Sequence, residues 1–227
     1  MKAIALLALA PLIVCISRSA NYSGQESTLR EEPVCVENSP ERRGDFGCSI
    51  VGNKPLPSGF RAPAYWEIDR FDSGDLAKEA AGPSNVAFEA HGSWWLMSVG
   101  SQIETPKGGQ RVANVNLGAL PEAPRYSMLV ISAYIPSGMT SRVHFHSGVE
   151  AFYAVDGEQC LETAERAYPM QKGDTLVVPT GVTMRLIATG MKPRRAFAVI
   201  VYDSSKPPTT RKPMETASQL VSCQGAR

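Results

Sequence analysis

Two histidines and one glutamate lie close together in the chain, at a spacing that suits metal coordination. His144 and His146 are two residues apart, and Glu150 follows after Ser147-Gly148. Side chains two residues apart on a β-strand project to the same face, so the two imidazoles would point together. A turn at Ser-Gly would bring Glu150 back on the next strand to face them. Two imidazoles and one carboxylate can hold a divalent transition metal and leave coordination positions open.

The elements that must position these three side chains are predicted to be short β-strands. One strand is expected at 65–69, and a helix is expected to begin at Asp72 or Ser73 and to end before Gly82-Pro83. Many short strands separated by glycine- and proline-containing turns predict an antiparallel sandwich or barrel. The further strands are expected at 86–88, 94–99, 111–116, 125–135, 150–155, 175–178, 184–188 and 196–202.

Two segments carry a resemblance to the cupin superfamily. Residues 138–157 match its first motif, G-x5-H-x-H-x3-E-x6-G, at every defined position. Residues 173–188 are similar to the second motif, G-x5-P-x-G-x2-H-x3-N, but Met184 stands at its histidine and Ala188 at its asparagine. The whole chain also resembles a group of exported single-domain cupin proteins, through Tyr65-Trp66, Trp95-Leu96 and residues 157–163.

The resemblance implies an all-β fold, a cupin jelly-roll barrel with one short helix and extended terminal segments. It implies that His144, His146 and Glu150 hold a metal, with Met184 at the position of the fourth ligand. It also implies a homodimer. Met184 is also expected to line the cavity. Strand parity and proximity to the motif add four further lining residues: Arg142, Phe152, Ala154 and Leu186.

The domain boundaries follow from composition. Residues 1–19 have the positive start, apolar run and small residues of a signal peptide, so we expect an exported protein; an uncleaved anchor is the alternative. Residues 20–60 are expected to be an extended lead-in, 61–203 the barrel with added strands and a lid, and 204–227 a tail. Cleavage after residue 19 would remove Lys2 and Arg18 and no acidic residue, changing the formal charge from +1 to −1. This balance predicts no nucleic-acid partner.

Four cysteines remain outside the predicted signal peptide, which suits two disulfides in an exported protein. We favour Cys35–Cys48 and Cys160–Cys223 among the three possible pairings. A free thiol at Cys160 near the cavity is the alternative.

Two functions fit these observations. The first is an enzyme that uses Fe, Mn, Zn or Ni to act on a small organic molecule, in the manner of a dioxygenase or an isomerase. An obvious general base is missing, although Tyr134, Tyr153 or Glu162 could serve. The second is a binding protein for a small ligand, whose three polar side chains hold no metal. Methionine is a poor ligand for Fe, Mn or Zn, and Met184 is expected to fill space in the barrel.

Overall fold

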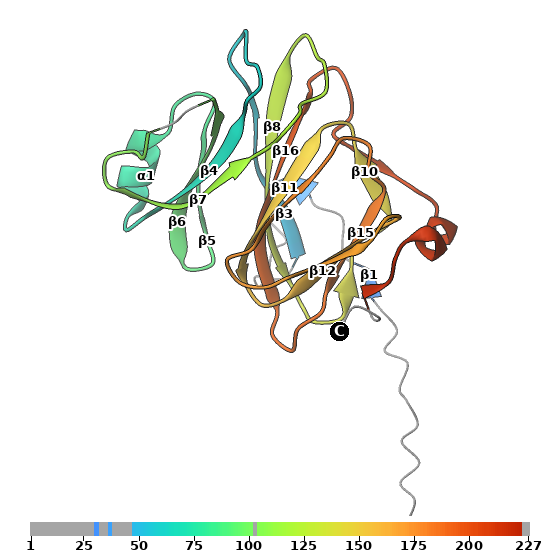
Figure 1. The fold of residues 1–227 in the computed structure, drawn as a ribbon. Helices are drawn as coiled ribbons and strands as arrows, with labels where there is room; N and C mark the ends of the chain where they lie inside the picture. Colours follow the sequence, from blue (N-terminus) through green and yellow to red (C-terminus); the bar gives the residue numbers. More distant parts are fainter. Residues whose placement is uncertain (1–29, 32–35, 38–46, 102–103, 224–227) are drawn as a thin grey trace, which may run out of the picture.

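The computed structural model describes residues 30–31, 36–37, 47–101 and 104–223. Their strands form three sheets, most of them antiparallel, and one short helix accompanies them (Figure 1). The predicted all-β, jelly-roll-like fold is therefore confirmed. The predicted signal peptide, residues 1–19, lies outside the described residues.

Two of the three sheets face each other. A cavity lies between them. The seven-stranded sheet contains β1 (Arg30–Glu31), β9 (Met139–Thr140), β10 (His144–His146), β12 (Gln159–Thr163), β13 (Ala167–Met170), β15 (Met184–Ala188) and β17 (Thr209–Arg211). The six-stranded sheet contains β2 (Val36–Glu37), β3 (Gly47–Pro55), β8 (Tyr126–Ile135), β11 (Val149–Asp156), β14 (Thr175–Val178) and β16 (Arg194–Asp203). Phe152, Leu161, Met184, Leu186 and Ala198 pack together between these two sheets.

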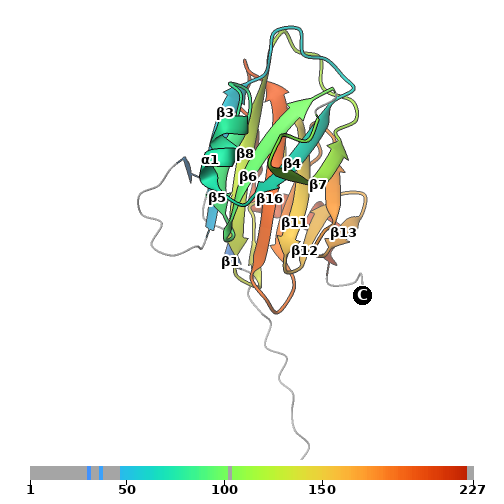
Figure 2. The same cartoon turned by 90° about the vertical axis from the view of Figure 1, so that its left-hand side faces the viewer.

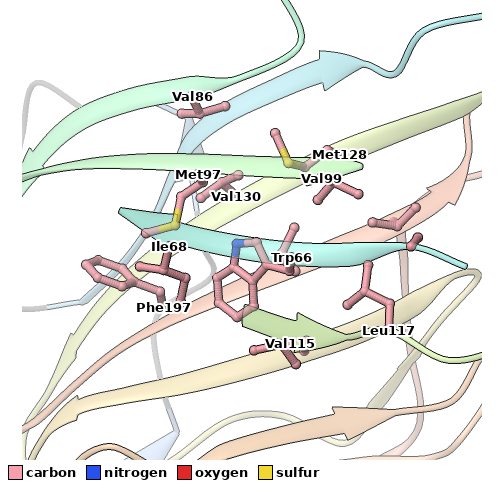
Figure 3. Close-up of a cluster of buried hydrophobic side chains, with 14 of the residues drawn as sticks. Trp66, Ile68, Val86, Met97, Val99, Val115, Leu117, Met128, Val130 and Phe197 are labelled. Carbon is pink, nitrogen blue, oxygen red and sulfur yellow. The ribbon is translucent and has the colours of Figure 1, made fainter. Parts of the chain in front are cut away.

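The third sheet packs on the other side of the six-stranded sheet. It contains β4 (Tyr65–Phe71), β5 (Val86–Ala90), β6 (Ser93–Gly100) and β7 (Gly109–Asn116). Figure 3 shows the resulting core, in which Trp66 and Ile68 from β4 lie with Phe197 from β16. The strands of the middle sheet are thus buried on both faces, which explains the almost unbroken apolar run of β16.

Helix α1 (Gly74–Ala80) covers the outer face of the four-stranded sheet (Figure 2). The Ser73 hydroxyl accepts a hydrogen bond from the Leu76 amide, so the helix begins where its sequence predicts. Ala77 packs against Phe71 and Leu96 on the sheet. The four-stranded sheet and α1 lie on the far side of the six-stranded sheet from the cavity (Figure 1). The added strands therefore form a second core on the side of the six-stranded sheet that faces away from the cavity.

Strand β3 corrects the expected start of the folded region. It lies within the segment expected to be a lead-in, yet it pairs antiparallel with β8 from Gly47 to Pro55. Cys48 and Ile50 from this strand line the cavity. The sequence gives a weak signal here because Gly52 and Pro55 interrupt the β-rich residues.

The residues after β16 also belong to the folded structure. Residues 204–223, which we name the C-terminal strap, turn back after Asp203 and add β17 to the edge of the seven-stranded sheet. The 3₁₀ helix η1 (Met214–Gln219) follows, and the strap ends at a disulfide between Cys160 and Cys223. This is one of the two pairings favoured above. Cys48 is also disulfide-bonded, while Cys35 lies outside the described residues.

No described helix is long and apolar enough to cross a membrane.

Candidate metal centre

The three predicted ligands converge at one end of the cavity. Potential ligand atoms of His144, His146 and Glu150 all lie within 4.8 Å of one another. His144 and His146 come from β10 with ring centroids 4.9 Å apart, as the two-residue spacing on a strand requires. Glu150 comes from the start of β11.

The turn between β10 and β11 depends on a glycine. A Cβ atom on Gly148 would collide with the backbone carbonyl oxygen of Val201 on β16. Because β11 pairs with β16 from Val149 onward, a larger residue at 148 would push β11 away from its partner. Gly148 thus allows the chain to reverse tightly enough for Glu150 to face the histidines.

Hydrogen bonds to backbone carbonyls set the protonation of both imidazoles. His144 Nδ1 lies 2.7 Å from the carbonyl oxygen of Arg142, and His146 Nδ1 lies 3.1 Å from that of Pro208. A carbonyl can only accept, so each Nδ1 carries the proton and donates. Nε2 of each neutral ring then keeps its lone pair, which is the atom that a metal needs.

One buried pair of atoms fits a bound metal. His146 and Glu150 are each only 4% exposed. His146 Nε2 and Glu150 Oε2 are 3.1 Å apart, but among the described residues neither atom has a partner in hydrogen-bond geometry. Buried polar atoms without partners are costly, and a cation between these two atoms and His144 would satisfy them. The donor set, two nitrogens and one carboxylate, suits Fe(II), Mn, Zn or Ni.

The two histidines differ in basicity. Burial lowers the pKa of His144 below its usual 6.5, and the neighbouring His146 and Arg211 lower it further. Burial also lowers the pKa of His146, but the adjacent Glu150 carboxylate and the Pro208 carbonyl outweigh it and raise that pKa above 6.5. His144 therefore stays neutral readily, whereas a proton on His146 would compete with a metal.

The site opens into a cavity of about 660 Å³ between the two facing sheets. Arg142, Phe152 and Leu186 line it, as the sequence predicts. Ala154 is buried, but its single methyl group is not part of the lining. The other residues of the lining are Cys48, Ile50, Leu129, Ile131, Ala133, Ser141, Arg194, Ala198 and residues 208–211.

Met184, which the sequence predicts to line the cavity, also lies outside the lining. It stands directly opposite His144 on β15, and its buried side chain packs with Phe152 and Leu161 between the sheets. The position of the fourth ligand in the cupin motif is thus occupied by a core side chain. This arrangement agrees with the space-filling role expected of Met184.

Sequence reasoning missed the contribution of the C-terminal strap. His146 pairs with Thr209 across the sheet, and the Thr209 hydroxyl lies 3.1 Å from His146 Nδ1. The Ser147 hydroxyl donates to the Pro207 carbonyl at 2.7 Å, and the Lys212 amide donates to the Val143 carbonyl at 2.8 Å. Two threonines just after a proline pair were the only signal of this edge strand.

Comparison with known families places these residues in a wider group. Residues 130–200, which include all three candidate ligands, match the sequence model described as "Cupin domain". This stretch of the chain is therefore a cupin domain. No curated protein matches it at a significant level.

Several solved structures are similar to part of this chain. The polyketide cyclase RemF from Streptomyces resistomycificus is 18% identical with a TM-score of 0.31, and the match covers 38% of this chain and 59% of the cyclase. A cupin-like protein from Thermotoga maritima is 15% identical with a TM-score of 0.34, over 41% of this chain and 69% of its own. A cupin 2 domain-containing protein from Halorhodospira halophila is 17% identical with a TM-score of 0.35, over 40% and 62% respectively. Likenesses this partial do not bear on the reaction.

Proposed function

We propose that this protein is an exported cupin that binds one divalent transition metal through His144, His146 and Glu150 and acts on a small organic molecule. The observation that carries the proposal is the buried pair His146 Nε2 and Glu150 Oε2. The two atoms are 3.1 Å apart without hydrogen-bond partners among the described residues, and they lie beside a cavity. In metal-free protein a proton on His146 could bridge this pair, and we infer that a cation takes its place.

The residues of the chain have distinct tasks in this proposal. The two histidines present neutral Nε2 atoms, because the Arg142 and Pro208 carbonyls hold their Nδ1 protons. Glu150 supplies the negative charge that offsets part of the charge of a divalent cation. When bound, such a metal provides Lewis acidity or, if it is iron, oxygen chemistry at its open positions, so an isomerase or a dioxygenase is the reaction class. The apolar walls bind the rest of the substrate and exclude water.

A non-catalytic binding protein is the second candidate, favoured by the lack of a proton-transfer group. Among the described residues that line the cavity, no tyrosine and no carboxylate other than Glu150 occurs. Tyr134, Tyr153 and Glu162, the possible bases named from the sequence, do not line it. Glu162 instead accepts hydrogen bonds from Arg185 and from the Cys223 amide.

Export and assembly are further parts of the proposal. A disulfide between Cys160 and Cys223, together with disulfide-bonded Cys48, supports an oxidising compartment outside the cytoplasm. We infer that residues 1–19 direct the chain there and are removed. We also infer a homodimer, which rests on the resemblance to cupins alone.

Metal analysis tests the central proposal. The untagged protein, purified from an exporting host, is measured for Fe, Mn, Zn, Ni and Cu, together with His144→Ala and His91→Ala. His91 is the remaining one of the three histidines in the sequence and lies outside the site, with its ring centroid 5.2 Å from that of Phe197. We expect about one equivalent of metal in the wild type and in His91→Ala and none in His144→Ala.

Two outcomes would contradict the assignment. If His144→Ala keeps its metal, these residues are not the ligands. If the wild-type protein takes up none of the five ions when each is offered, the binding protein becomes the better reading. Turnover would then no longer be expected.

A further inference from the structure

Arginine side chains give the cavity a strongly positive lining. Arg142, Arg194 and Arg211 all line it. Glu150 is the single carboxylate among the described lining residues, and it faces the histidines. Formal charges of the lining thus sum to positive even with both imidazoles neutral, and a divalent cation would add to this. Such a lining favours an anionic ligand over a neutral one.

Two of the arginines lie beside the candidate metal ligand His144. Arg211 on β17 is the direct cross-strand partner of His144 on β10. Paired residues on neighbouring strands place their side chains on the same face of a sheet, so the guanidinium projects on the side of the imidazole. Arg142 precedes His144 by two residues and also lines the cavity. Both arginines are exposed, which puts them at the mouth of the cavity.

The wall beyond this mouth is mostly apolar. Side chains from both facing sheets contribute to it, among them Ile50, Leu129, Ile131, Phe152, Leu186 and Ala198. The cavity volume of about 660 Å³ lies within the range of small-molecule sites. A ligand that uses both features has an apolar body and one negatively charged end.

We propose that the cavity selects a small organic acid, with its apolar body between the two sheets and its carboxylate held at the mouth by Arg211 and Arg142. A guanidinium can bind a carboxylate with two parallel N–H···O bonds, which a lysine cannot do. The proposal rests on the proposed function for the identity of the site, and it names the class of molecule that the site accepts.

Matched pairs of acid and amide test the charge requirement. Isothermal titration calorimetry is performed with 3-phenylpropanoate and hexanoate, and with the corresponding neutral amides, 3-phenylpropanamide and hexanamide. Each amide keeps the shape of its acid but loses the charge. We expect at least one acid to bind at least tenfold more tightly than its amide, and we expect this preference to shrink as salt is raised.

The variants locate the charge that is responsible. Arg211→Gln should weaken binding of the acid about tenfold, the loss expected for one charge-assisted hydrogen bond at a solvent-exposed site, and should leave the weak binding of the amide unchanged. Lys212→Gln is the matched control. It removes the same charge one residue away, but Lys212 does not line the cavity and instead lies 5.0 Å from the Phe145 ring. We expect it to bind the acid like the wild type.

Several results would overturn the proposal: binding of neither acid, equal binding of acid and amide, an unchanged affinity in Arg211→Gln, or an equal loss in Lys212→Gln. Measuring each titration with metal-loaded and metal-free protein separates this proposal from the proposed function. An arginine-dependent preference for the acid in a protein that takes up no metal would support the ligand class and reject the metal. Normal metal content without that preference would support the metal site and reject the ligand class.

Discussion

Removal of the disulfide between Cys160 and Cys223 should cost a large share of the stability of the protein. The two cysteines are 63 residues apart in the sequence, and the closed loop includes β13 to β17. Restricting a loop of this length in the unfolded chain contributes about 4 kcal/mol in the chain-entropy description. The free energy of unfolding of globular proteins is about 5–15 kcal/mol, so this loss is a substantial fraction of the total stability.

The assay is urea denaturation of the wild type and of the double variant Cys160→Ala/Cys223→Ala, followed by tryptophan fluorescence. We expect the free energy of unfolding to fall by about 4 kcal/mol. The m-value should rise, because the unfolded chain becomes less compact without the cross-link. The alanine pair avoids new free thiols that could exchange with the disulfide of Cys48.

Metal content separates a loss of stability from damage to the site. The β17–β10 pairing and the Ser147–Pro207 hydrogen bond hold the strap next to His146 without help from the disulfide. The folded double variant should therefore match the metal content of the wild type in the absence of urea. A stability loss below about 1 kcal/mol, with an unchanged m-value, would refute the entropic reasoning. Loss of metal at full folding would show that the disulfide also positions the strap.

Two further predictions concern the site. In metal-free protein, Glu150→Gln should lower the pKa of His146 below its usual 6.5, because burial lowers that pKa and the carboxylate that raises it is gone. An NMR titration of the histidine ring protons measures this pKa. An unchanged pKa would show that the Glu150 carboxylate does not raise it. Met184→His should tighten binding of Mn, Fe or Zn by at least tenfold, because residue 184 lies opposite His144 and a third imidazole could complete the ligand set. Competition with a chelator measures this affinity, and equal affinity would mean that residue 184 cannot reach the metal.

The local parts of the site could be predicted from the sequence because they depend on strand parity and one tight turn. The spacing of His144, His146 and Glu150 leaves few other arrangements once the segment is a β-hairpin. The jelly-roll fold followed from many short strands and the cupin motifs, and it is confirmed. Helix α1 was predictable from its Ser73 cap.

The remaining features depend on pairing between distant segments. Thr209 reaches His146 across 63 residues, and nothing in a polar, proline-containing segment indicates which strand it will join. The side of the barrel on which the four-stranded sheet packs could not be predicted from the sequence either. Its alternating pattern predicts one buried face, but that face could cover the cavity or the back of the barrel equally well. In the structure this sheet packs on the back of the barrel. The large side chains of Trp66 and Phe197 fill the space between it and the six-stranded sheet (Figure 3).

The position of the strap in the chain has a consequence for biosynthesis. Ribosomes deliver His144, His146 and Glu150 long before residues 208–211, which complete the wall around them. Until then His146 lacks the Pro208 carbonyl that fixes its proton. Loading of the proposed metal should therefore be a late event, after synthesis has passed residue 211, and the ion would come from the compartment in which the finished chain folds.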